Sequence, residues 1–129
     1  MPTSGFLEYA RSLRDAIDRL TDSGDAVLVS LQLDQRSSVR GFIDGTLQFH
    51  DGSQLIFREF LDTTRNEPRL MYAYHFQDAA QELVFRYDNA AHRPALSQPA
   101  HKHTPAGIEA AHLPPFTVVL DEILQFLGP

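Results

Sequence analysis

The sequence of 129 residues contains no cysteine, which excludes disulfide bonds, zinc sites built from thiolates and catalysis by a cysteine nucleophile. It also contains no run close to the roughly 20 apolar residues that a membrane-spanning helix needs. Residues 1–25 carry charges throughout and lack an apolar core segment, so we expect no signal peptide. Together these absences predict a soluble, cytoplasmic protein without a membrane partner.

Basic residues are in the minority. Eleven Lys and Arg residues against seventeen Asp and Glu residues give a formal net charge of −6. Broad, sequence-blind affinity for nucleic acid depends mainly on many contacts between Lys or Arg and phosphate, so this charge argues against such affinity. A small, locally basic active site is still compatible with it.

Several catalytic and binding motifs are absent too. The sequence contains no GxGxxG, no GxxxxGK[ST], no GxSxG and no HExxH. Dinucleotide binding, P-loop chemistry, an α/β-hydrolase nucleophile and a zinc-protease helix are therefore without support.

Two amphipathic helices are predicted at the ends of one domain that spans residues 1–129. The first begins after Ser4 as the N-cap, repeats apolar residues at steps of three and four, and ends at Gly24. The second follows Pro114-Pro115 and is closed by Gly128. Packing on the domain's own sheet is the expected role of both apolar faces, and binding to a partner protein is the alternative.

Between the helices the pattern alternates, which predicts β-strands near residues 26–33, 39–49, 54–61, 69–77 and 82–88. Short links between consecutive strands indicate an antiparallel meander. We therefore expect an α+β fold in which about five strands are flanked by an N-terminal and a C-terminal helix.

Two hairpins set the predicted register. A three-residue loop of Asp51, Gly52 and Ser53 would place Leu47 opposite Phe57 and Phe49 opposite Leu55. Glu59 would then point inward opposite Gly45, where it needs an Arg or His partner, because an unpaired buried carboxylate is costly.

The second hairpin, around residues 78–81, pairs an aromatic row with a mixed one. The row of Tyr72, Tyr74 and Phe76 faces Leu83, Phe85 and Tyr87. If the apolar rows share one side of the sheet, the opposite side carries Arg58, His75, Arg86 and Asp88.

Three of the six histidines, His92, His101 and His103, follow the last of these strands within twelve residues, in a segment predicted as a proline-bearing loop. Imidazole can exchange a proton near neutral pH or bind a transition metal. This segment, together with the polar side of the sheet, is the candidate site.

One interpretation is metal-free cleavage of RNA, which requires no cofactor. Histidines among His75, His92, His101 and His103 would act as acid and base, while Arg86 or Arg58 stabilises a phosphorane-like transition state. Tyr74 or Tyr87 would help to orient the substrate, and the nearest additional cations are Arg93 and Lys102.

Two other interpretations stay open. His101 and His103 could share a divalent metal such as zinc or manganese with His92 or Asp88, which would make a hydrolytic metal site. Alternatively, these histidines and the pairs Arg58 with Asp44 and Arg86 with Asp88 could be ordinary sheet and loop residues without catalytic function.

An ordered series of segments resembles the TumE family of small bacterial and archaeal toxins from toxin–antitoxin pairs. The series covers roughly residues 42–124 and consists of FHDGSQLIFREFLD (49–62), YAYHFQD (72–78), LVFRYDNAAHRP (83–94), HKH (101–103) and LDEIL (120–124). The positions that match its most distinctive segments are Arg58, Glu59, His75, Arg86, Asp88, Asn89, His92, His101 and His103.

The resemblance implies a cytoplasmic toxin that a small antitoxin, encoded nearby, masks. Cleavage of RNA is what such toxins commonly do, but the resemblance supplies no catalytic set. Similar sequences often carry a further His or Pro near Ala91 and Arg93, and this departure weakens a metal site built on additional imidazoles. A non-catalytic module that binds through a sheet edge or through residues 116–127 is the competing hypothesis. The oligomeric state is open, a homodimer included.

Overall fold

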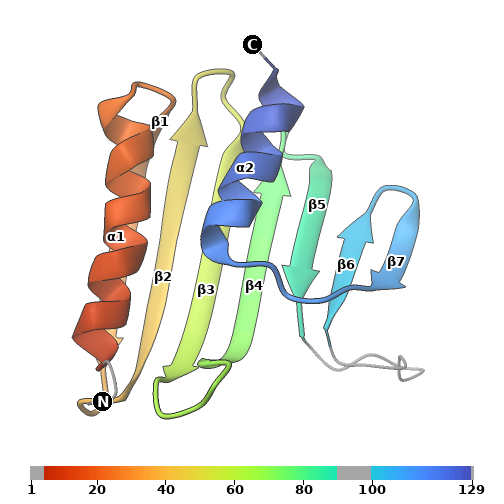
Figure 1. Ribbon diagram of the computed structural model, residues 1–129. Helices are drawn as coiled ribbons and strands as arrows, with labels where there is room; N and C mark the ends of the chain where they lie inside the picture. Colours follow the sequence, from red (N-terminus) through yellow and green to blue (C-terminus); the bar gives the residue numbers. More distant parts are fainter. Residues whose placement is uncertain (1–4, 90–99, 129) are drawn as a thin grey trace.

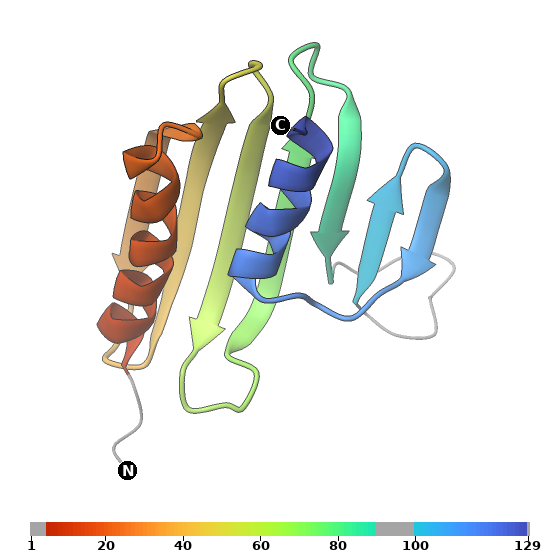
Figure 2. The ribbon, with the colours of Figure 1, turned by 45° about the horizontal axis from the view of Figure 1, so that its top comes forward.

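A computed structural model describes residues 5–89 and 100–128, and its architecture is the predicted α+β class (Figure 1). Seven antiparallel strands follow one another in chain order, and both helices pack on the same face of the sheet (Figures 1 and 2). None of the described helices is long and apolar enough to cross a membrane. The elements are α1 (Phe6–Asp22), β1 (Ala26–Gln35), β2 (Arg40–Phe49), β3 (Gln54–Asp62), β4 (Arg69–Gln77), β5 (Leu83–Asp88), β6 (His101–Thr104), β7 (Gly107–Ala110) and α2 (Phe116–Leu127).

The five predicted strands are confirmed, and two short strands were missed. β6 and β7 form a hairpin in the segment predicted as loop, so the loop assignment of His101 and His103 was wrong. β6 pairs with β5 and thereby satisfies backbone groups that the edge of β5 would otherwise expose. Residues 90–99, which include His92 and Arg93, lie outside the described part of the chain.

Alternating side chains of β2 to β5 point toward the helices and form the core. Leu47, Phe57 and Phe76 are buried there, and from the helices Ile17 and Ile123 pack onto them. Burying one such side chain stabilises the fold by roughly 1.5–3 kcal/mol. The predicted packing role of both helices is therefore confirmed.

A close approach at Gly45 helps to seat α2. Gly45 pairs with Phe57, and a Cβ atom at Gly45 would lie only 2.7 Å from the Phe57 ring. The ring therefore covers the glycine backbone and makes an edge contact with Phe116 of α2, at 5.1 Å between centroids. This packing fixes the start of α2 over the centre of the sheet.

The register of β2 and β3 differs from the predicted one. Leu47 pairs with Leu55 and Gly45 with Phe57, whereas Leu47 was expected opposite Phe57 and Phe49 opposite Leu55. The two registers differ by two residues, so each side chain keeps its predicted face of the sheet.

The turn explains this shift. The Phe49 N–H donates to the Ser53 carbonyl at 2.9 Å, so the loop is His50, Asp51 and Gly52. Asp51 Oδ1 accepts hydrogen bonds from both the backbone and the hydroxyl of Ser53, which draws Ser53 into the ladder. Gly52 supplies the positive φ of 88° that the turn requires.

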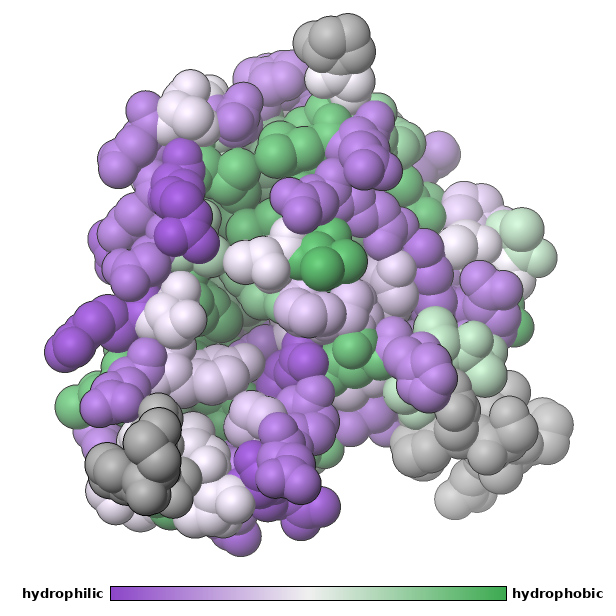
Figure 3. Space-filling model, in the orientation of Figure 1, coloured by the Kyte–Doolittle hydropathy of each residue, from purple (hydrophilic) through white to green (hydrophobic). Residues whose placement is uncertain are grey.

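Both helices end as the sequence predicts. Gly24 has a φ of 83° just after α1, and Gly128 has a φ of 74° and donates its N–H to Leu124 at the end of α2. Ser4, the predicted N-cap, lies outside the described residues, and Gly5 occupies the cap position. Hydrophilic residues cover the outward sides of the helices, while hydrophobic residues show between them (Figure 3).

Candidate functional site on the open face of the sheet

The face of the sheet opposite the helices, here called the open face, carries two adjacent rows of side chains that cross the strands. Residues in one row are partners in the antiparallel register, so each row has one member per strand. The first row is Thr46, Ile56, His75, Arg86 and His103, and the second is Asp44, Arg58, Ala73, Asp88 and His101.

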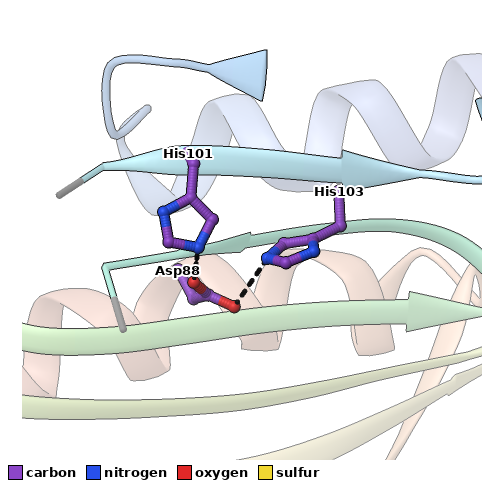
Figure 4. A group of neighbouring side chains, drawn as sticks. All are labelled: Asp88, His101 and His103. Atoms are coloured by element: carbon purple, nitrogen blue, oxygen red, sulfur yellow. Dashed lines mark ion pairs between the residues drawn. The ribbon is translucent and has the colours of Figure 1, made fainter. Parts of the chain in front are cut away.

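Asp88 is the centre of a charged cluster in these rows. Arg86 Nε donates to Asp88 Oδ2 at 2.7 Å, and His101 Nε2 contacts the other carboxylate oxygen. His103 Nε2 lies 3.3 Å from Asp88 Oδ2 (Figure 4). The side chain of Asp88 is 5% exposed and that of His101 is 0% exposed, so the contact between these two groups is shielded from solvent.

Arg86 extends the cluster to β4. Its Nη1 lies 3.4 Å from His75 Nδ1, and His75 Nε2 lies 3.1 Å from the side-chain oxygen of Gln77. The imidazoles of His101 and His103 are 4.8 Å apart between centroids. His75 and His103 therefore flank Arg86 within one row, while Asp88 and His101 support that row from the adjacent one.

A hollow of about 580 Å³ lies beside the cluster. Arg58, Ala73, His75 and Arg86 are among its lining residues. The small side chain of Ala73 stands between Arg58 on β3 and Asp88 on β5, which are about 10 Å apart across two strand spacings. Among the described residues, no acidic group lies within 4.0 Å of the exposed Arg58 guanidinium. The hollow thus has guanidinium groups on two sides.

The structure brings most of the predicted site residues together. His75, His101, His103, Arg86 and Asp88 form the cluster, and Arg58 borders the hollow. His92 lies outside the described residues.

Other predicted contributors face away. Tyr74 and Tyr87 point toward the helices, where the Tyr87 hydroxyl donates to Glu122 at 2.6 Å. Lys102 Nζ lies on that same side, 2.8 Å from Glu122. Their predicted participation in the site is wrong, because residues adjacent in a strand project to opposite faces.

Glu59 forms a separate polar cluster under the helices. It pairs with Ile43, not Gly45, and is 0% exposed. Instead of Arg or His, two tyrosine hydroxyls hold it: Tyr9 donates to Oε1 at 2.7 Å and Tyr74 donates to Oε2. Burial is the largest influence and raises the pKa of Glu59, although the hydrogen bonds from both tyrosines oppose it. This cluster ties α1 to the sheet.

Ala73 is the site residue that sequence reasoning missed. The residue becomes significant only because its neighbours in the row are Arg58 and Asp88. A signal was present for the β6–β7 hairpin: Thr104-Pro105-Ala106-Gly107 has proline and glycine at positions favoured in a β-turn. Recognising that turn would have placed His101 and His103 on a strand.

Within residues 5–89 and 100–128, Asp88, His101 and His103 are grouped so that they could hold a metal. One ligand atom from each lies within 4.8 Å of the others. A tetrahedral zinc ion with bonds of about 2.1 Å needs ligand atoms about 3.4 Å apart, so small side-chain rotations would suffice. The donor set fits zinc or manganese, with Asp88 as the oxygen ligand.

Comparison with known protein families gives a match to the family described as Toxin TumE, over residues 16–128. The match includes every described residue of the cluster and of the hollow. No curated protein and no solved structure matches the chain.

Proposed function

The chain belongs to the TumE toxin family, and from this premise we propose that it is a metal-independent ribonuclease with histidine acid and base groups. As a member of a toxin family, it has a cognate antitoxin as partner. The observation that carries the proposal is the row His75, Arg86 and His103, supported by Asp88 and His101.

The row contains the groups that RNA cleavage by transesterification requires. The base takes the proton of a 2′-hydroxyl, whose oxygen attacks the adjacent phosphate, and the acid protonates the departing 5′-oxygen. His75 and His103 lie two strands apart, about 10 Å, on either side of the Arg86 guanidinium. His75 is partly exposed, and the His103 side chain is 19% exposed although its Nε2 is buried against Asp88, so His103 would exchange the proton through Nδ1.

Arg86 and Arg58 supply positive charge at the hollow. A phosphate above Ala73 would lie between these two guanidinium groups, which offset the charge that develops in the transition state. Asp88 orients Arg86 and His103 together, and His101, which is buried, acts as a positioning residue for that carboxylate. The reaction needs no cofactor, since the RNA supplies the nucleophile.

A second candidate is a metal hydrolase, and the proximity of Asp88, His101 and His103 favours it. A zinc or manganese ion held by these three side chains would supply a Lewis acid. Against it, Arg86 already bonds to Asp88 and adds a positive charge beside the ion.

Cleavage of a defined RNA by the purified toxin, released from its antitoxin, tests the proposal. We expect cleavage in the presence of EDTA, products with 2′,3′-cyclic phosphate ends, and no cleavage at a 2′-deoxy position. The metal hydrolase predicts loss of activity with the chelator and recovery with zinc or manganese. A protein that cleaves no RNA under any of these conditions would support a non-catalytic binding module instead.

A further inference from the structure

We infer that the substrate is single-stranded RNA, held along a trough that crosses the open face from the histidine row to Phe42. This inference deepens the proposed function and rests on it for the position of the scissile phosphate. The trough extends beyond the residues that cleavage of the RNA requires. This extension indicates that the ligand is longer than the scissile phosphate and its two neighbouring groups.

A second hollow of about 580 Å³ adjoins the first one. The two hollows share Gln32, Asp44 and Arg58, so they form one depression across β1 to β5. The far end of the second hollow is lined by Arg36 and Phe42. A ligand that occupies both hollows must therefore be longer than one phosphate.

Aromatic and apolar side chains line this end of the open face. Phe42 and Phe60 are cross-strand partners, and their rings stack at 4.5 Å with an interplanar angle of 21°. The Arg36 guanidinium lies over the Phe42 ring at 5.5 Å. Met71, which pairs with Phe60 on the same face, is 60% exposed, and Ile56 in the histidine row is 41% exposed. Proteins bind unpaired bases by stacking them on such aromatic rings and guanidinium planes.

The charges along the trough suit an RNA strand with few phosphate contacts. Arg36, Arg58 and Arg86 are the cations; Arg36 bonds to Asp34 at 2.9 Å, an exposed pair that water already weakens. Asp44 accepts hydrogen bonds only, so it can bind the amino group of a base but not a phosphate.

A duplex does not fit this surface. Paired bases are stacked on one another and present only their edges, whereas the depression offers apolar side chains that need a free base face. Three phosphate contacts in a single strand predict a slope of about −2 in log affinity against log salt, by the factor of roughly 0.7 for each contact.

Binding of a labelled 2′-O-methyl RNA dodecamer, which lacks the nucleophile and cannot be cleaved, tests the inference by fluorescence anisotropy. We expect the single strand to bind at least about tenfold more tightly than a duplex of the same sequence. Phe42→Leu should weaken the single-strand complex about tenfold, because the ring supports the Arg36 guanidinium on which a base would stack. Phe42→Tyr should restore it, and Phe126→Leu, an exposed aromatic position on α2, should leave it unchanged.

Equal binding of single strand and duplex, wild-type affinity of Phe42→Leu, or no binding of any RNA would overturn the inference. If Phe42→Leu binds RNA normally and the protein cleaves RNA, the RNA-binding trough is refuted and the ribonuclease proposal stands. If binding depends on Phe42 but the protein cleaves no RNA, the ribonuclease proposal is refuted and the RNA-binding trough stands.

Discussion

Asp88 and His101 are direct partners across strands β5 and β6, and both side chains are buried on the face of the sheet that has no helix. A buried carboxylate is costly unless hydrogen bonds and charges satisfy it. Arg86 and both histidines of β6 meet that need, so the cluster is held in one arrangement before any substrate binds. Fixed geometry of this kind is what acid–base chemistry on a phosphate requires.

Replacing the two accessible histidines should abolish toxicity. His75→Ala or His103→Ala is expected to lower the rate of RNA cleavage by roughly 10²–10⁴-fold, the usual contribution of a general acid or base. Growth of cells that express the variant reports toxicity, and a thermal melt reports the fold. His50→Ala, at an exposed position in the β2–β3 turn, is the matched control and should remain toxic. A fully active double variant at positions 75 and 103 would eliminate the acid–base mechanism.

His101 calls for a different substitution because it is buried. His101→Gln should preserve the side-chain volume while weakening the support of Asp88. We expect kcat to fall by at least about tenfold with KM for RNA within about twofold, since the residue positions catalytic groups and does not touch RNA. A change confined to KM, or to thermal stability alone, would argue against that role.

Filling the hollow should block the substrate without unfolding the protein. Ala73→Leu adds a branched side chain between Arg58 and Asp88, where a phosphate is proposed to bind. Because the side chain extends into open space, its effect on stability should stay within about 0.5 kcal/mol. Activity should fall at least about 100-fold in a cleavage assay, whereas Ala106→Leu, at an exposed turn, should be unaffected. An active Ala73→Leu enzyme would place the phosphate elsewhere.

The strands of the main sheet and the faces of their side chains could be predicted because alternation has a period of two. That period placed Arg58, His75, Arg86 and Asp88 together on one side, even though the β2–β3 register was displaced by two residues. By the same rule, Tyr74 and His75 point to opposite faces of the sheet because they are neighbours in one strand. The prediction that Tyr74 or Tyr87 orients the substrate did not apply this rule, and for that reason it was wrong.

β6 could not be found from periodicity. Its four residues, HKHT, contain no apolar position, so no alternation of hydrophobicity marks them. The strand depends on tertiary partners: the free edge of β5 offers backbone hydrogen bonds, and Asp88 attracts His101 and His103. Contacts between residues distant along the chain determine this part of the site, and hydrophobic periodicity does not encode them; the turn residues of the β6–β7 hairpin are the local signal.

Substitutions on α2 separate a binding role from a packing role. Leu120 is 4% exposed, so Leu120→Asp buries an unpaired charge and should unfold the domain. Loss of toxicity in that variant would therefore say nothing about binding, and Leu124, partly buried against the core, has the same weakness. Val118→Asp changes a side chain that is 47% exposed and should alter stability by no more than about 0.5 kcal/mol. If toxicity depends on the open face of the sheet, the Val118→Asp variant stays toxic. A folded Val118→Asp protein that is not toxic would indicate instead that α2 binds a partner.

The pH dependence of stability should carry the signature of Glu59. Burial raises its pKa in the folded protein above the usual value of about 4.3, so the folded state keeps a proton that the unfolded state has lost. Stability from this group is complete below the unfolded pKa. It declines as pH rises toward the folded pKa, by up to about 1.4 kcal/mol per pH unit.

Glu59→Gln removes this titration while it keeps a polar group between Tyr9 and Tyr74. Urea unfolding of both proteins from pH 4.5 to 7.5 gives the difference in free energy of unfolding, in which the other carboxyl groups cancel. We expect the wild-type protein to lose stability relative to the variant as pH rises. A difference that is constant over this range would mean that Glu59 ionises in the folded protein as easily as in water, and the two tyrosines would then stabilise its charged form fully.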